Sequence, residues 1–228
     1  LEHTDVQVGQ LIDELEARGI RDNTLVIYIF SHNGASAEGV DGSVAELNLH
    51  NGIASTIEEH IAVAKQLGGL EEIGGPKMDN MYHAAWAWSG DSPFRYTKLV
   101  ASDWGGTRTP MVISWRKRIK PDSTPRSQFL QVNDVVPTLY DILDNTPPKI
   151  VDGHEQDPLD GVSFAGTFDS ADAPEVKQTQ YFEIMGSRGI YHDGWMASTF
   201  GPRTPWVATP PDISNWDPAE DEWQLFDT

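Results

Sequence analysis

The stretch from residue 4 to residue 30 constrains the fold of this chain more than any other. Residues 4–18 place apolar side chains at helical spacing on one face and polar side chains on the other, and Gly19 suits the end of a helix. Leu25–Phe30 is then a continuous β-branched and aromatic run, typical of a strand buried on both faces of a parallel sheet. Helix, short loop and buried strand make half of a βαβ unit, so we expect the α/β fold class.

Two further segments extend this pattern and one long stretch interrupts it. Met111–Trp115 has the composition of the next buried strand, and Val132–Leu143 has the periodicity of a helix. Residues 35–91 are interpreted as an insertion, because so long a stretch between strands is usually functional or specific to a family. Residues 1–145 are therefore expected to hold the later strands of a mixed, mostly parallel sheet flanked by helices.

The C-terminal part of the chain has a different character. Residues 145–175 are rich in proline, aspartate and glycine, which is typical of loops. Three strand-like pieces follow at Thr179–Ile184, Gly189–Thr199 and Trp223–Phe226. We therefore expect residues 146–228 to form a linker and a small antiparallel C-terminal subdomain of the α+β type.

The charge balance excludes some classes of partner. The net charge is −19, from 35 acidic and 16 basic residues. Nucleic acids and anionic membrane surfaces both attract basic proteins, so neither is expected as a partner. An anionic small molecule is still possible if cations gather at one site or a metal is present. The chain has no cysteine, which excludes disulfides and zinc–thiolate sites, and no apolar run long enough for a transmembrane helix.

Two segments carry side chains suited to chemistry. Ser31, His32 and Asn33 directly follow Leu25–Phe30, at the strand end where α/β sheets bind ligands, and Gly34 allows a sharp turn. The second segment, Ser92–Lys98, is a polar loop with a single lysine, followed by Gly105-Gly106-Thr107-Arg108. From the residues alone, His32 can equally belong to a polar turn hydrogen-bonded to the backbone, and Lys98 can be a surface lysine.

These segments, together with Tyr181–Glu183 and Arg188–Trp195 near the C-terminus, resemble the later part of the sulfatases, in particular bacterial arylsulfatases. Sulfatases carry Asp-Asn-Gly after the strand, where Asp and Asn ligate a divalent cation, usually calcium. Asn33 and Gly34 match this motif and His32 departs from it. The resemblance implies a metal site at His32 and Asn33, with imidazole favouring a transition metal or weakening the site for calcium.

The resemblance also implies a role for the lysine. Sulfatases carry a lysine shortly before the paired glycines, and it contacts the oxygens of the sulfate ester, so Lys98 is the expected substrate-binding and catalytic residue. A histidine is expected at position 103, where this chain has Asp103. Asp103 could supply the carboxylate that His32 lacks; the alternative is unrelated drift in a protein losing its activity. A distance above about 8 Å between Asp103 and Asn33 would remove the first hypothesis.

The nucleophile of the family has no counterpart here. It is a cysteine or serine in the motif Cys/Ser-x-Pro-x-Arg, converted to formylglycine, and it lies N-terminal to everything that this chain matches, as does the first Asp-Asp metal pair. Ser92-Pro93-Phe94-Arg95 does not qualify, because its proline stands one place too early. The nucleophile motif is therefore absent from this chain.

We therefore interpret the chain as the C-terminal part of an arylsulfatase-type sulfuric ester hydrolase, inactive by itself. Its partners would be a small sulfate ester and the missing N-terminal half of the domain. Two alternatives stay open. One is a phosphate or phosphonate ester hydrolase of the same alkaline-phosphatase-like superfamily, for which His32 leaves room. The other is a non-catalytic sulfatase-like binding module.

Overall fold

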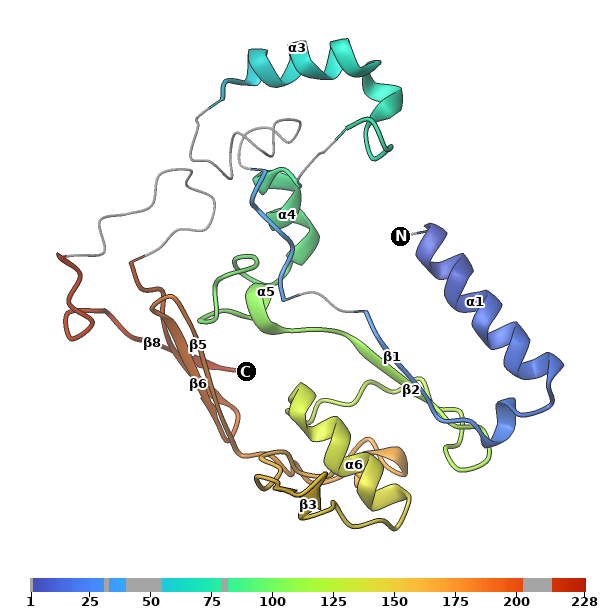
Figure 1. The fold of residues 1–228 in the computed structure, drawn as a ribbon. Coiled ribbons are helices and arrows are strands. Elements are labelled where there is room, and N and C mark those ends of the chain that lie inside the picture. The colour runs from blue at the N-terminus through green and yellow to red at the C-terminus, as the bar shows by residue number, and fades with distance from the viewer. Residues whose placement is uncertain (1, 31–32, 40–54, 79–81, 203–214) are drawn as a thin grey trace. The chain divides into compact units, whose positions relative to one another are not determined.

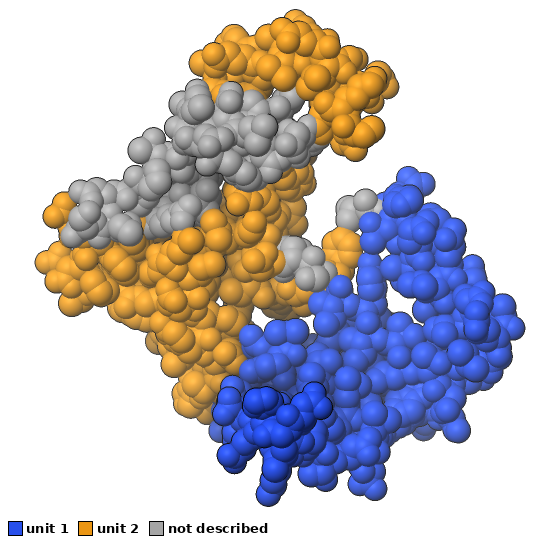
Figure 2. All heavy atoms as spheres, viewed as in Figure 1, with its two compact units in different colours: residues 1–29, 111–178 blue, residues 30–110, 179–228 orange. Residues whose placement is uncertain are grey.

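The computed structural model describes residues 2–30, 33–39, 55–78, 82–202 and 215–228 (Figure 1). It mixes helices and strands and belongs to the α/β class. The chain forms two compact units, residues 1–29 with 111–178 and residues 30–110 with 179–228 (Figure 2). The sequence-based boundary between residues 145 and 146 stays a prediction.

The first unit begins with a helix and a strand, as the sequence predicts. Helix α1 spans Glu2–Ala17, a 3-10 turn spans Arg21–Asn23, and strand β1 spans Val26–Ile29. Strand β1 pairs antiparallel with β2, Met111–Ser114, to give a two-stranded sheet. A parallel strand buried on both faces was expected, but β1 is only half-buried. Within the described part of the unit, no further strand joins this sheet.

The rest of this unit is built around a buried carboxylate. A 3-10 turn at Val132–Asp134 leads into helix α6, Val135–Ile142, and Gln131 and Asp134 form a capping box at the start of the 3-10 turn. Short strands β3 (Ile150–Val151) and β4 (His154–Glu155) pair with each other, and a 3-10 turn follows at Ala165–Phe168. The Asp134 side chain accepts a hydrogen bond from the Gln131 N–H at the start of the 3-10 turn and does not cap α6 itself.

The described part of the second unit contains three helices and a four-stranded sheet. The helices are α3 (Ile57–Leu67), with a 3-10 turn after it at Leu70–Glu72, α4 (Ala84–Asp91) and the single turn α5 (Trp104–Thr107). The sheet has the order β5-β6-β7-β8 and is antiparallel throughout, with strands Thr179–Ile184, Ser187–His192, Trp195–Thr199 and Gln224–Asp227 (Figure 1). The small antiparallel sheet expected from the sequence is therefore present.

One face of this sheet packs against the loop before α5. Tyr191 and Met196 are buried on that face, and the Ser102 backbone N–H donates to Ser187 Oγ over 3.0 Å. A Cβ atom on Gly189 would lie 3.3 Å from the Ala101 carbonyl oxygen, so β6 and the loop are in close contact. This packing fixes the loop that carries the predicted site residues. Among the described helices, none combines the length and the apolar character needed to cross a bilayer.

Candidate functional site

Gly34 brings the segment after β1 against the lysine loop. Its φ of +86° lies in the left-handed region, and a Cβ there would come within 2.3 Å of Lys98 N and 2.6 Å of Gly105 O. The Lys98 N–H donates to Ala35 O over 3.1 Å, and the Ala35 N–H donates to the carboxylate of Asp91. Only glycine allows this approach without strain. The two segments that the sequence grouped together therefore lie in direct contact.

The side chain of Lys98 is held by the same segment. Its Nζ lies 2.9 Å from Glu38 Oε2, and both side chains are 31% exposed. Ser36 Oγ donates to the same Glu38 oxygen, which orients the carboxylate. An ammonium group has three donors, and Glu38 occupies one of them here. Lys98 is thus pre-oriented while a ligand from solvent can still reach it.

The paired glycines compact the loop that ends at Asp103. A Cβ on Gly105 would lie 2.1 Å from Tyr96 O, and one on Gly106 would lie 2.0 Å from Val100 O. The Gly105 N–H donates to Arg95 O over 2.9 Å. The chain can fold this tightly only because both residues lack a side chain. The loop is therefore held to one shape by its own backbone contacts.

Asp103 stands at the N-terminal boundary of α5, but its side chain does not cap that turn. Its Oδ2 accepts a hydrogen bond from Ser102 Oγ over 2.8 Å, and its Oδ1 lies 3.7 Å from Arg95 Nε. Burial raises the pKa of the Asp103 carboxyl above its usual range, while the hydrogen bond from Ser102 and the charge of Arg95 oppose this rise. The carboxyl consequently keeps its proton to a higher pH than an ordinary aspartate.

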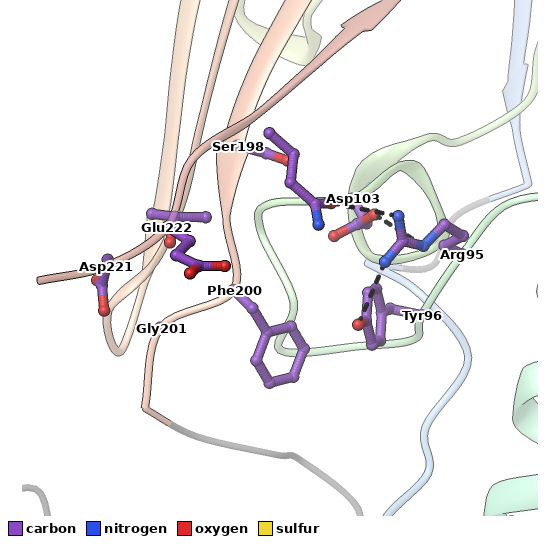
Figure 3. A pocket seen from close by; sticks show the side chains of 10 residues that line it. Arg95, Tyr96, Asp103, Ser198, Phe200, Gly201, Asp221 and Glu222 are labelled. Atoms are coloured by element: carbon purple, nitrogen blue, oxygen red, sulfur yellow. Dashed lines mark hydrogen bonds and ion pairs between the residues drawn. The ribbon is translucent and has the colours of Figure 1, made fainter.

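Asp103 and Arg95 line a pocket of about 260 Å³ (Figure 3). Its wall comes from three segments: the loop at Arg95–Asp103, the end of β7 and the residues after it, Ser198–Gly201, and the approach to β8 at Asp221–Gln224. Tyr96 and Phe200 give the pocket an aromatic side, with ring centroids 4.7 Å apart. The sequence did not predict that residues at the ends of β7 and β8 belong to the site. No motif marks these residues, and only strand pairing brings them close to the loop.

The predicted site residues fall in different places. Lys98 lies on the side of the loop that meets Ala35 and Glu38 and is not among the residues that line the pocket, whereas Asp103 is. Asn33 is exposed in the bend before Gly34, and His32 lies outside the described residues. The proposed exchange of roles between His32 and Asp103 stays a prediction.

The described residues do not by themselves fit a complete metal site. Across residues 2–30, 33–39, 55–78, 82–202 and 215–228, no group of three or more His, Cys, Asp or Glu side chains is arranged to hold a metal ion. Asn33 is the one predicted ligand within these ranges. The carboxylate of Asp103 is already engaged by Ser102 and Arg95.

Comparison with known proteins gives consistent matches. The sulfatase family model matches residues 1–145 of the 228. An uncharacterized sulfatase of Schizosaccharomyces pombe is 30% identical over 148 residues, which cover 65% of this chain and 24% of that protein. The chain thus spans about a quarter of the length of this curated relative.

A solved structure supports the fold. It is described as "Metabolism of multiple glycosaminoglycans by bacteroides thetaiotaomicron is orchestrated by a versatile core genetic locus", and it matches 98% of this chain and 36% of its own with a TM-score of 0.57. At 17% identity this likeness concerns the fold alone. Since the family model covers well over half of the residues, the chain belongs to the sulfatase family.

Proposed function

We propose that this chain is the C-terminal part of an arylsulfatase-type sulfuric ester hydrolase and that it supplies Lys98 as the substrate-binding lysine. The observation that carries the proposal is the contact at Gly34, which packs the Asn33-Gly34 turn onto the backbone of Lys98. The same segment orients the Lys98 ammonium through Glu38 and leaves it partly exposed. A pre-oriented cation is what a reaction that develops negative charge on oxygen requires.

In the proposed reaction a nucleophile outside this chain attacks the sulfur of the ester. The bond from sulfur to the alcohol or phenol oxygen then breaks, and that oxygen leaves with the electron pair and takes up a proton. Lys98 would stabilise the charge on the sulfuryl oxygens. Asp103 is proposed as a second catalytic group, because its raised pKa favours the protonated form that a general acid needs.

Sulfatases as a family bind a divalent metal. From this chain, His32 and Asn33 are the proposed ligands, to be completed by groups beyond the described residues. When bound, the cation would add positive charge near the sulfate oxygens. Calcium is the family expectation, but the imidazole of His32 suits a transition metal better than calcium. Measuring metal content after dialysis, for the natural chain and for His32→Asp, would identify the preferred ion.

The test of function uses the native protein purified from its source, with its intact mass and N-terminal sequence determined first. We expect it to hydrolyse an aryl sulfate, and we expect aryl phosphate to be a poorer substrate. Lys98→Met should lower kcat/KM for the sulfate by about 10²- to 10³-fold, which is the usual effect of removing one stabilising donor.

Lys77→Met is the matched control, because Lys77 is an exposed lysine paired with Glu72 over 2.6 Å and has no proposed role. Equal activity of the two variants would contradict the role of Lys98. Preferred hydrolysis of aryl phosphate would favour the phosphate ester alternative. The 228-residue chain alone should be inactive, and turnover by it would show that the nucleophile has been misplaced.

A further inference from the structure

We infer that Glu38 is a specificity-determining residue, because its carboxylate beside Lys98 favours a ligand group with one negative charge over a group with two. A sulfate monoester carries one charge, whereas a phosphate monoester carries nearly two at neutral pH, since its second pKa is about 6. The inference rests on the proposed function, in which Lys98 contacts the ester. It adds the reason why a sulfate ester is preferred to a phosphate ester.

The backbone on both sides of Glu38 is held in place. Ala37, which precedes it, is only 2% exposed. Gly39, which follows it, donates its N–H to Tyr82 O over 3.0 Å. The carboxylate can therefore turn about its own side-chain bonds, but the chain that carries it stays next to Lys98. A ligand that binds the ammonium group has this negative charge as a neighbour.

The geometry of the ammonium group sets the distance between the two anions. Its three N–H bonds point to the corners of a tetrahedron, and Glu38 Oε2 lies along one of them at 2.9 Å from Lys98 Nζ. A ligand oxygen bound to a second N–H at a similar distance lies roughly 5 Å from that carboxylate oxygen. Like charges at this separation, screened by solvent at side chains 31% exposed, weaken binding by about five- to tenfold. Each further negative charge on the ligand adds the same factor.

The experiment compares three aryl esters on the native protein and on its Glu38→Gln variant. An aryl sulfate and an aryl methylphosphonate each carry one charge, and an aryl phosphate carries nearly two. We expect the variant to raise kcat/KM for the phosphate relative to the sulfate by about five- to tenfold. The ratio of methylphosphonate to sulfate should stay unchanged. Equal changes for all three esters would show that Glu38 only orients Lys98 and would overturn the inference.

Two further variants are matched controls. Glutamine keeps the length of the side chain and an acceptor for Ser36 Oγ, so Glu38→Gln removes the charge and keeps the hydrogen bond. Glu38→Asp keeps the charge and should keep the natural ratio of phosphate to sulfate. Glu72→Gln removes a carboxylate that pairs with Lys77 over 2.6 Å and should also keep that ratio. A shift with either control as large as with Glu38→Gln would contradict the role of Glu38.

Anion binding separates this inference from the proposed function. Inorganic sulfate carries two charges and methanesulfonate carries one, and neither contains an ester bond, so calorimetry on the native protein requires no hydrolysis. Glu38→Gln should tighten the binding of sulfate about five- to tenfold more than that of methanesulfonate. This shift without turnover of aryl sulfate would remove the proposed function alone. Unchanged relative affinities, or no binding of either anion, would overturn the inference.

Discussion

Each unit of the molecule contains a pair of lysine and carboxylate, and the two pairs differ in every respect that decides their role. Lys177 Nζ lies 3.0 Å from Asp134 Oδ1 in the first unit, with side-chain exposures of 8% and 0%. Lys98 Nζ lies 2.9 Å from Glu38 Oε2 in the second, with both side chains 31% exposed. The distances are nearly equal, so distance alone does not distinguish the two pairs.

The difference is in the surroundings. Asp134 also accepts hydrogen bonds from the backbone N–H groups of Gln131 and Val162, and Lys177 also donates to Asn133 Oδ1. Both charges of this pair are therefore fully compensated by partners inside the protein, as a buried structural ion pair requires. The Lys98 pair stays open to solvent, so its cation remains available for an anionic ligand. Burial and the number of partners therefore separate a structural lysine from a candidate functional one.

The largest expected effect comes from breaking the buried pair. Asp134→Ala should lower the free energy of unfolding by about 3–5 kcal/mol, because it strands the Lys177 charge and two backbone N–H groups. Glu38→Ala, which breaks the half-exposed pair, should cost at most about 1 kcal/mol. Urea unfolding of both variants makes the comparison. Similar decreases in the free energy of unfolding would mean that the two ion pairs contribute equally to stability.

A smaller effect tests the contact at Gly34. Gly34→Ala should cost roughly 2–5 kcal/mol, the sum of a left-handed conformation and a collision with the backbone of Lys98 and Gly105. Gly19→Ala is the control in the first unit. Its φ is +66° and nothing lies within 4 Å of the added Cβ, so only the conformational cost of about 1–2 kcal/mol applies. Thermal and urea unfolding should separate the two variants, and equal costs would argue against tight packing at Gly34.

The smallest effect concerns pH. Because burial raises the pKa of Asp103, the folded state binds this proton more tightly than the unfolded state. This contribution is fully present below the ordinary value of 3.8 and is lost as pH rises through the raised pKa. Asp103→Asn removes the titration, so the natural chain should lose stability relative to the variant over that window. Parallel curves of stability against pH for the two proteins would contradict this.

Local patterns predicted much of the fold. The helix expected over Val132–Leu143 contains α6, Val135–Ile142, and the β-branched run at residues 25–30 contains β1. The antiparallel sheet near the C-terminus also follows its strand-like pieces. These elements depend on side-chain periodicity and turn residues close in sequence. The pairing of β1 with β2 was not predictable, because it joins residues more than 80 positions apart.

The candidate site divides in the same way. Asn33, Gly34, Lys98 and the paired glycines were recognisable because their spacing follows a family pattern. The pocket was not, because Ser198, Phe200 and Glu222 carry no motif and meet Asp103 only through strand pairing. Lys177 likewise gave no signal, since its partner Asp134 lies 43 positions earlier.

By itself the sequence determined which segments form helices and strands, where glycine is required, and the family to which the chain belongs. Only the tertiary structure decided which lysine belongs to a buried ion pair and which remains accessible to a ligand. It also decided that Asp103 is a partly buried carboxyl that lines a pocket. The physical reason is that burial and hydrogen-bond satisfaction arise from contacts between distant segments. A motif specifies a residue type at a position, but its charge state and its access to ligands depend on what packs around it.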